Sequence, residues 1–172
     1  MLRGTTQLWN DQRGAAAAEM ALILPLALAL LFTTFEGAYY MICEHRVIKG
    51  VRDAARYAAR LDLTNYACPG ATFSGTAATK TGIQNLARTG KLSPDSATLA
   101  KAAKIWGTDP NKVIITVTCA SSQGGIYAAT GGNAPKVKIS ARVVYPSIMA
   151  SLGFTRATID IGAAAQSPVI GL

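Results

Sequence analysis

The sequence has few groups that could carry out acid–base or metal chemistry. It has a single histidine, His45, and nine acidic residues. It has no C-x-x-C pair, no H-E-x-x-H motif, and no glycine-rich loop followed by the lysine and hydroxyl pair that binds phosphate. The three cysteines, Cys43, Cys68 and Cys119, lie far apart, and one histidine cannot complete a zinc site with them. We therefore predict that the protein is not an enzyme and holds no metal or cofactor.

Acidic residues are also too few to balance the basic ones. Seventeen lysines and arginines give a formal net charge of +8. These residues are spread along the chain, without the interleaved aromatic residues that line a single-strand nucleic-acid groove. The charge therefore predicts a basic, solvated surface and no specific nucleic-acid partner.

One long apolar run dominates the N-terminal part of the chain. Arg13, Gly14 and four small residues precede Glu19, and the apolar segment that follows continues to Phe35. Residues 15–35 have about the length of a bilayer span, for which roughly 20 residues suffice. Glu19 is the exception, because an ionisable residue costs a few kcal/mol at the bilayer centre. It therefore needs a partner.

The order of these residues resembles the class III signal of type IV pilins and pseudopilins. The features that carry the resemblance are Arg13-Gly14, the small residues, Glu19 and the run 22–26, which contains Pro25. More narrowly, the segment resembles the TadE-like minor pilins of the Tad (tight adherence) pilus system. Residues 52–60 resemble a second segment of that family, so that the resemblance covers about residues 13 to 60. Met20 follows Glu19 where the family often has phenylalanine.

The resemblance implies that a prepilin peptidase, an inner-membrane aspartic protease, cuts between Gly14 and Ala15 and removes residues 1–14 as a leader. In many relatives the new N-terminal residue is then methylated. Glu19 of the same or a neighbouring subunit would pair with the new amine on Ala15, because one ion pair costs less than two isolated charges in a poor solvent.

The resemblance also implies partners and a location. The partners are the peptidase, other pilin subunits, the inner-membrane assembly platform and membrane lipid. The chain is expected in the bacterial inner membrane, with a cytoplasmic N-terminus and residues 63–172 in the periplasm, and later in the pilus or at the cell surface. There it would contribute to pilus assembly, adhesion and biofilm formation.

Two other interpretations of the chain stay open. In the first, residues 15–35 are a plain signal anchor of an envelope protein unrelated to pili, and Glu19 reaches the membrane interface along its own stem. In the second, the protein is an adhesin displayed on the pilus, and the glycine-rich loop 121–135 contacts the target.

Residues 15–62 are predicted to form one alanine- and leucine-rich helix. We expect a kink at Pro25, because proline removes a backbone hydrogen bond and clashes with the carbonyl of Ala21. Residues 42–61 form an amphipathic half with one apolar and one basic stripe. The apolar stripe holds Val47, Val51, Ala54, Ala58 and Leu61, and the basic stripe, predicted to be solvated, holds Arg46, Lys49, Arg52, Asp53, Arg56 and Arg60.

Residues 63–172 are predicted to form an α+β domain of the type IV pilin kind. Short helices are expected at residues 76–87, ended by Gly90, and at 94–105, capped by Ser93. Alternating β-branched residues predict strands at 112–119, 136–145 and 156–165. In the third of these, Ile159 and Ile161 should face inward. The strands should form a small antiparallel sheet that packs on the long helix.

The cysteines allow one disulfide if this domain lies outside the cytoplasm. A bond between Cys68 and Cys119 would close a loop of about 50 residues and stabilise the fold by about 4 kcal/mol in the chain-entropy treatment. Cys43 would then be a packed thiol in the helix. A pairing of Cys43 with either of the others stays open.

Overall fold

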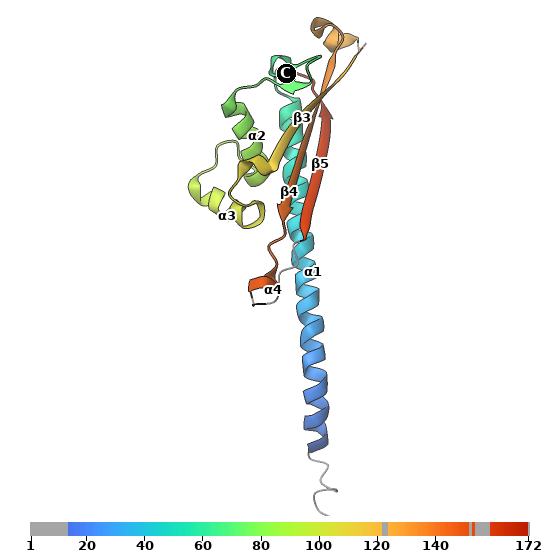
Figure 1. The fold of residues 1–172 in the computed structure, drawn as a ribbon, viewed down its shortest axis with the longest axis vertical. Coiled ribbons are helices and arrows are strands. Elements are labelled where there is room, and N and C mark those ends of the chain that lie inside the picture. Colours follow the sequence, from blue (N-terminus) through green and yellow to red (C-terminus); the bar gives the residue numbers. More distant parts are fainter. Residues whose placement is uncertain (1–13, 122–123, 152, 154–158, 172) are drawn as a thin grey trace, which may run out of the picture. The chain divides into compact units, whose positions relative to one another are not determined.

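The computed structural model describes residues 14–121, 124–151, 153 and 159–171 of the chain. The chain divides into two compact units, with the division between Tyr39 and Tyr40. Helix α1 (Ala15–Ala59) contributes to both units (Figure 1). Except for Gly14, the predicted leader lies outside the described residues. The long N-terminal helix, the antiparallel sheets and the short helices confirm the predicted α+β class.

Helix α1 runs without interruption through Pro25 and ends at Ala59. The kink expected at Pro25 stays a prediction. The helix ends three residues earlier than predicted, because Asp62 starts a new turn. The Asp62 carboxylate accepts a hydrogen bond from the Thr64 amide at 2.8 Å, which caps the short helix η2 (Leu63–Asn65). Hydrogen bonding from the Thr64 side chain, followed by that from the Thr64 amide, lowers the pKa of Asp62 below its ordinary value.

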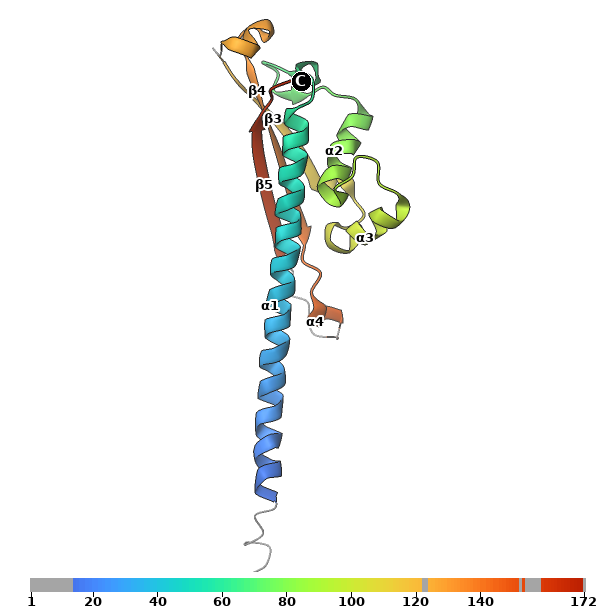
Figure 2. The same ribbon diagram turned by 180° about the vertical axis from the view of Figure 1, so that it is seen from behind.

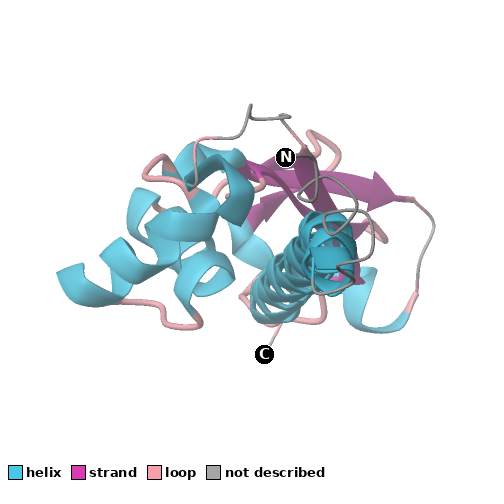
Figure 3. Cartoon of the chain, turned by 90° about the horizontal axis from the view of Figure 1, so that it is seen from below, coloured by secondary structure: helices cyan, strands magenta, loops and turns pink. Residues whose placement is uncertain are grey.

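The second unit is built on a three-stranded antiparallel sheet in the order β3-β4-β5. The strands are β3 (Val113–Ala120), β4 (Ala134–Val144) and β5 (Asp160–Pro168). Ile115 lies opposite Ile139, and Ile139 lies opposite Ala165, which fixes the register across all three. The sheet lies alongside the C-terminal half of α1 (Figures 1 and 3). The first residues of the predicted third strand, 156–158, lie outside the described residues.

The predicted faces of the sheet and of α1 are largely confirmed. The fully or nearly buried side chains on these elements are Val47, Val51, Ala54 and Ala58 of α1, Val113 and Val117 of β3, and Val137, Ile139 and Val143 of β4. The prediction for Ile159 is wrong, since its side chain is 46% exposed. Ile159 precedes the first paired residue of β5, Asp160, so no strand face covers it. Ile161 is buried as expected.

Two helices pack together to one side of α1 (Figures 1 and 2). They are α2 (Ala77–Thr89), which ends at Gly90 with a left-handed φ of 75° as predicted, and α3 (Ser96–Trp106). The predicted cap of α3 is wrong, because Asp95 and not Ser93 caps the helix. The Asp95 carboxylate accepts from the Thr98 amide at 2.6 Å, and a charged acceptor is favoured at a helix N-terminus. The connector between β4 and β5 holds the short helix α4 (Ile148–Ser151).

A two-stranded sheet that was not predicted follows α1. It pairs β1 (Tyr66–Ala67) with β2 (Thr72–Phe73). The Tyr66 hydroxyl donates a hydrogen bond to the Ala58 carbonyl, and burial, followed by the nearby Tyr57, raises the pKa of Tyr66 well above its ordinary value. Cys68 forms the predicted disulfide with Cys119 of β3, and the two are 51 positions apart. Cys43 lies buried in α1, outside this bond.

Two further short 3-10 helices lie in the second unit, and the last described residues of the chain form hydrogen bonds near the end of α1. They are η3 (Pro110–Lys112) and η4 (Gly125–Thr130), the second of which lies in the predicted loop 121–135. The amide of Val169 donates to Pro135, and the amide of Ile170 donates to the carbonyl of Ala59, each at 2.9 Å. The Tyr127 hydroxyl donates to the Val169 carbonyl at 2.7 Å. Val169 is fully buried, so these residues are part of the core.

Gly50 allows α1 and α2 to approach closely. A Cβ at this position would lie 1.9 Å from the carbonyl oxygen of Ala87. We expect Gly50→Ala to destabilise the second unit by about 1–3 kcal/mol, the usual range for overpacking, although alanine favours a helix more than glycine does. Urea unfolding of the full chain in non-ionic micelles measures this change. Gly37→Ala is the control, because nothing lies within 4 Å of a Cβ there. Equal stability of the two variants would contradict the prediction.

Candidate processing and assembly site

The bond between Gly14 and Ala15 lies at the first residue of α1. Both residues are exposed, and a Cβ added to Gly14 would meet nothing within 4 Å. The first four amides of a helix have no partner within that helix. A protease that extends the chain here therefore disrupts fewer backbone hydrogen bonds than it would further along α1. The predicted cleavage bond is thus sterically open.

Glu19 lies one helical turn after Ala15. Residues four apart share a helix face, with about 5–6 Å between their Cβ atoms. The Glu19 side chain is exposed, and among the residues that the structure describes no cation lies within ion-pair distance of it. An amine created on Ala15 would lie on the same face as this carboxylate. The helix therefore brings together the two groups predicted to pair.

Apolar side chains cover the helix after Glu19. The large ones that are exposed are Met20, Leu22, Ile23, Leu24, Leu26, Leu28, Leu30, Leu31, Phe32 and Phe35. No residue of the most apolar 18-residue window of α1 is buried. A helix that is apolar on all sides needs lipid or other protein around it. By length and composition, this segment can cross a membrane.

The hydroxyl groups in this segment do not need water. Thr33 donates to the Ala29 carbonyl and Thr34 to the Leu31 carbonyl, each at 2.7 Å. Polar groups in hydrocarbon must find their partners within the protein. Both threonines meet that requirement inside α1.

A comparison with protein families adds to the interpretation of this segment. Residues 14–56 match the family model described as TadE-like protein. This segment is similar to the TadE-like family. The match confirms the resemblance read from the residues, and it begins at Gly14, next to the predicted cleavage bond. The TadE-like segment makes up about a quarter of the chain. Neither curated proteins nor solved structures give a match.

The predicted site residues fall into two groups. Gly14, Ala15, Glu19 and Pro25 lie within the TadE-like segment, at the N-terminal end of α1. The Cys68–Cys119 disulfide lies in the second unit. One further feature of that unit, a basic cavity between α1, α2 and α3, was not predicted. Arg46 and Lys49 of α1 line this cavity and belong to the predicted basic stripe. The lining residues from α2 and α3 are not part of any sequence motif.

Proposed function

We propose that the protein is a minor pilin, or pseudopilin, of a Tad-type type IV pilus. A prepilin peptidase cuts it between Gly14 and Ala15. Residues 15–35 then hold it in the inner membrane, with the N-terminus on the cytoplasmic side, until the helix packs against those of other subunits in a filament. The protein contributes to pilus assembly and adhesion as a structural subunit, and it is the substrate of an enzyme and not an enzyme itself.

One observation carries this proposal. Glu19 is an exposed carboxylate at the start of an otherwise apolar helix, inside the segment that matches the TadE-like family. A plain membrane anchor gains nothing from an acid at this position, because an ionisable group opposes insertion. A cleaved pilin does gain, because the acid neutralises the new amine of its own chain or of a neighbour.

Two further features support the details of the proposal. The Cys68–Cys119 disulfide suits an oxidising compartment such as the periplasm. The second unit, from Tyr40 onward, is a folded unit with its own sheet and core. Major subunits of the system that the chain resembles are very short peptides with almost no globular domain, so a unit of this size supports a minor component.

The mature N-terminus tests the proposal. When the full chain is co-expressed with an active prepilin peptidase, we expect mass spectrometry of the purified protein to find Ala15 as its first residue, with or without one methyl group. Gly14→Leu should leave the chain uncut, because the residue before the cleaved bond would no longer be glycine. Gly4→Leu makes the same change elsewhere in the leader and should be cut normally. A mature chain that begins at Met1, or beyond Phe35, would refute the proposal.

A further inference from the structure

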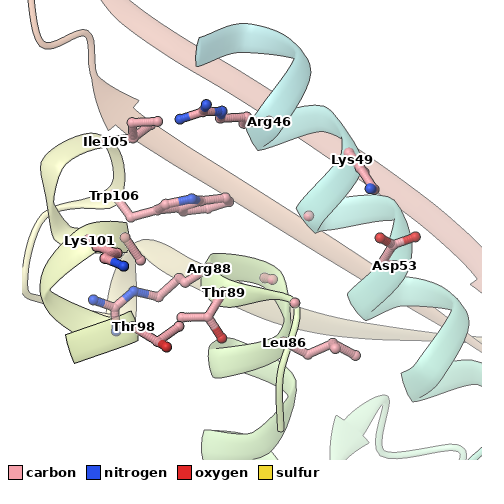
Figure 4. Close-up of a pocket in the computed structure, with 14 residues that line it drawn as sticks. Arg46, Lys49, Asp53, Leu86, Arg88, Thr89, Thr98, Lys101, Ile105 and Trp106 are labelled. Carbon is pink, nitrogen blue, oxygen red and sulfur yellow. The ribbon is translucent and has the colours of Figure 1, made fainter. Parts of the chain in front are cut away.

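A cavity of about 330 Å³ lies between helices α1, α2 and α3 of the second unit. This volume is near the lower end of the range for ligand pockets, about 300–1,000 Å³. Arg46 and Lys49 reach it from α1, Arg88 from α2 and Lys101 from α3 (Figure 4). The one carboxylate in its lining is that of Asp53. Basic side chains from three separate helices therefore meet around one hollow.

Arg88 has an unused donor in this cavity wall. Its side chain is 9% exposed, and its Nη2 donates to the carbonyls of Gly107, at 2.8 Å, and Thr108, at 3.3 Å. Its Nε is buried and has no hydrogen-bond partner. A guanidinium presents its five donors in a fixed geometry. The two carbonyls that accept from Nη2 therefore cannot also accept from Nε. Arg88 therefore places a buried cation with one unsatisfied donor in the wall of the cavity.

The other three cations form no ion pair among the described residues. They are Arg46, Lys49 and Lys101, and their side chains are exposed. Cations that line one concavity reinforce each other's potential and attract an anion. The cavity is therefore electrostatically complementary to a negatively charged group.

Part of the lining is apolar. Leu86, Ile105 and the ring of Trp106 border the same hollow, and Figure 4 shows the indole reaching from α3 toward α1. A small inorganic anion would contact only the basic groups. An acidic side chain has an apolar stem and a charged end, and so it matches both parts of the lining.

We propose that this cavity binds a glutamate or aspartate side chain presented by a different, acidic protein. A second copy of this chain is a poorer partner, because each copy carries a formal charge of +8 and copies repel each other. The proposal goes beyond the pilus role and does not depend on it, since it concerns only the folded second unit.

Fluorescence of Trp106 reports on the cavity. The chain has two tryptophans, so Trp9→Phe in the full chain leaves Trp106 as the only one. The probe is a capped pentapeptide, acetyl-Ala-Leu-Glu-Leu-Ala-amide, added to the protein in non-ionic micelles. We expect a saturable change in Trp106 emission with this peptide and none with its glutamine counterpart. An equal response to both peptides, or to neither, would overturn the proposal. A saturable response to inorganic phosphate at matched ionic strength would also overturn it, in favour of a phosphate site.

Two neighbouring lysines on α3 provide a matched pair of variants. Lys101 lines the cavity and Lys104 does not, and both side chains are exposed, so neither change should disturb the fold. Loss of one charge-assisted hydrogen bond should weaken peptide binding by about tenfold in Lys101→Gln. Lys104→Gln should bind within about twofold of the parent, since it changes only the overall charge. Equal weakening in both variants would show unspecific attraction and would overturn the proposal.

Discussion

Removal of the disulfide should destabilise the second unit by about 4 kcal/mol, since Cys68 and Cys119 are 51 positions apart and the bond restricts a long loop in the unfolded chain. Native domains are stable by only about 5–15 kcal/mol, so this loss is a large part of the total. The double variant Cys68→Ala/Cys119→Ala should melt on the order of 10–20 °C below the wild type for a unit of this size. Thermal unfolding of the full chain in non-ionic micelles, followed by tryptophan emission, measures the shift.

A reducing agent provides the control for this experiment. It should lower the melting temperature of the wild type to that of the double variant, and it should leave the double variant unchanged. Cys43→Ala keeps the bond and should cost far less, because it removes only one sulfur from the core. A loss below about 1 kcal/mol in the double variant would mean that the unfolded chain is already restricted in this region.

Replacement of Glu19 should block entry into filaments without blocking membrane insertion. In Glu19→Ala the amine that cleavage would create on Ala15 has no carboxylate on its own helix face, and an uncompensated charge within a membrane costs about 2.5–3.5 kcal/mol. That cost corresponds to a reduction of about a hundredfold in incorporation. Removal of an acid makes the segment more apolar, so insertion itself should continue. Immunoblots of sheared pili and of membrane fractions measure the two properties separately.

The same substitution further along α1 serves as the control. Glu44→Ala removes one acid from the same helix, outside the apolar segment, and should leave incorporation within about twofold of the wild type. If Glu19→Ala also assembles normally, the carboxylate is not needed for assembly, and the plain membrane anchor becomes the better interpretation of residues 15–35.

Linear patterns were enough to predict the sheet, and the processing site that they also predict stays a prediction. In β3 and β4, inward and outward positions alternate along the chain, and Val113, Val117, Val137 and Ile139 are buried as this alternation predicts. The predicted site depends on residues within one helical turn, from Gly14 to Glu19. Periodicity and short spacing define such features completely, because the groups involved are neighbours in sequence as well as in space.

Features that depend on contacts between distant segments were missed or misplaced. The strands of the β1–β2 pair have two residues each, too few to show any period. Ile159 follows the alternation of β5 but lies beyond the last strand pair, and sequence alone does not show where pairing ends. The basic cavity needs Arg46, Arg88 and Lys101 from three helices. Periodicity gives the face on which each of these lies but not the element that it meets.

The bond from the Ile170 amide to the Ala59 carbonyl sets an order of events during synthesis. The core of the second unit cannot close until residues 169 and 170 have left the ribosome, because fully buried Val169 belongs to that core. At about 5–20 residues per second, the apolar residues 15–35 emerge several seconds earlier. The apolar segment is therefore available for membrane targeting before the second unit can fold.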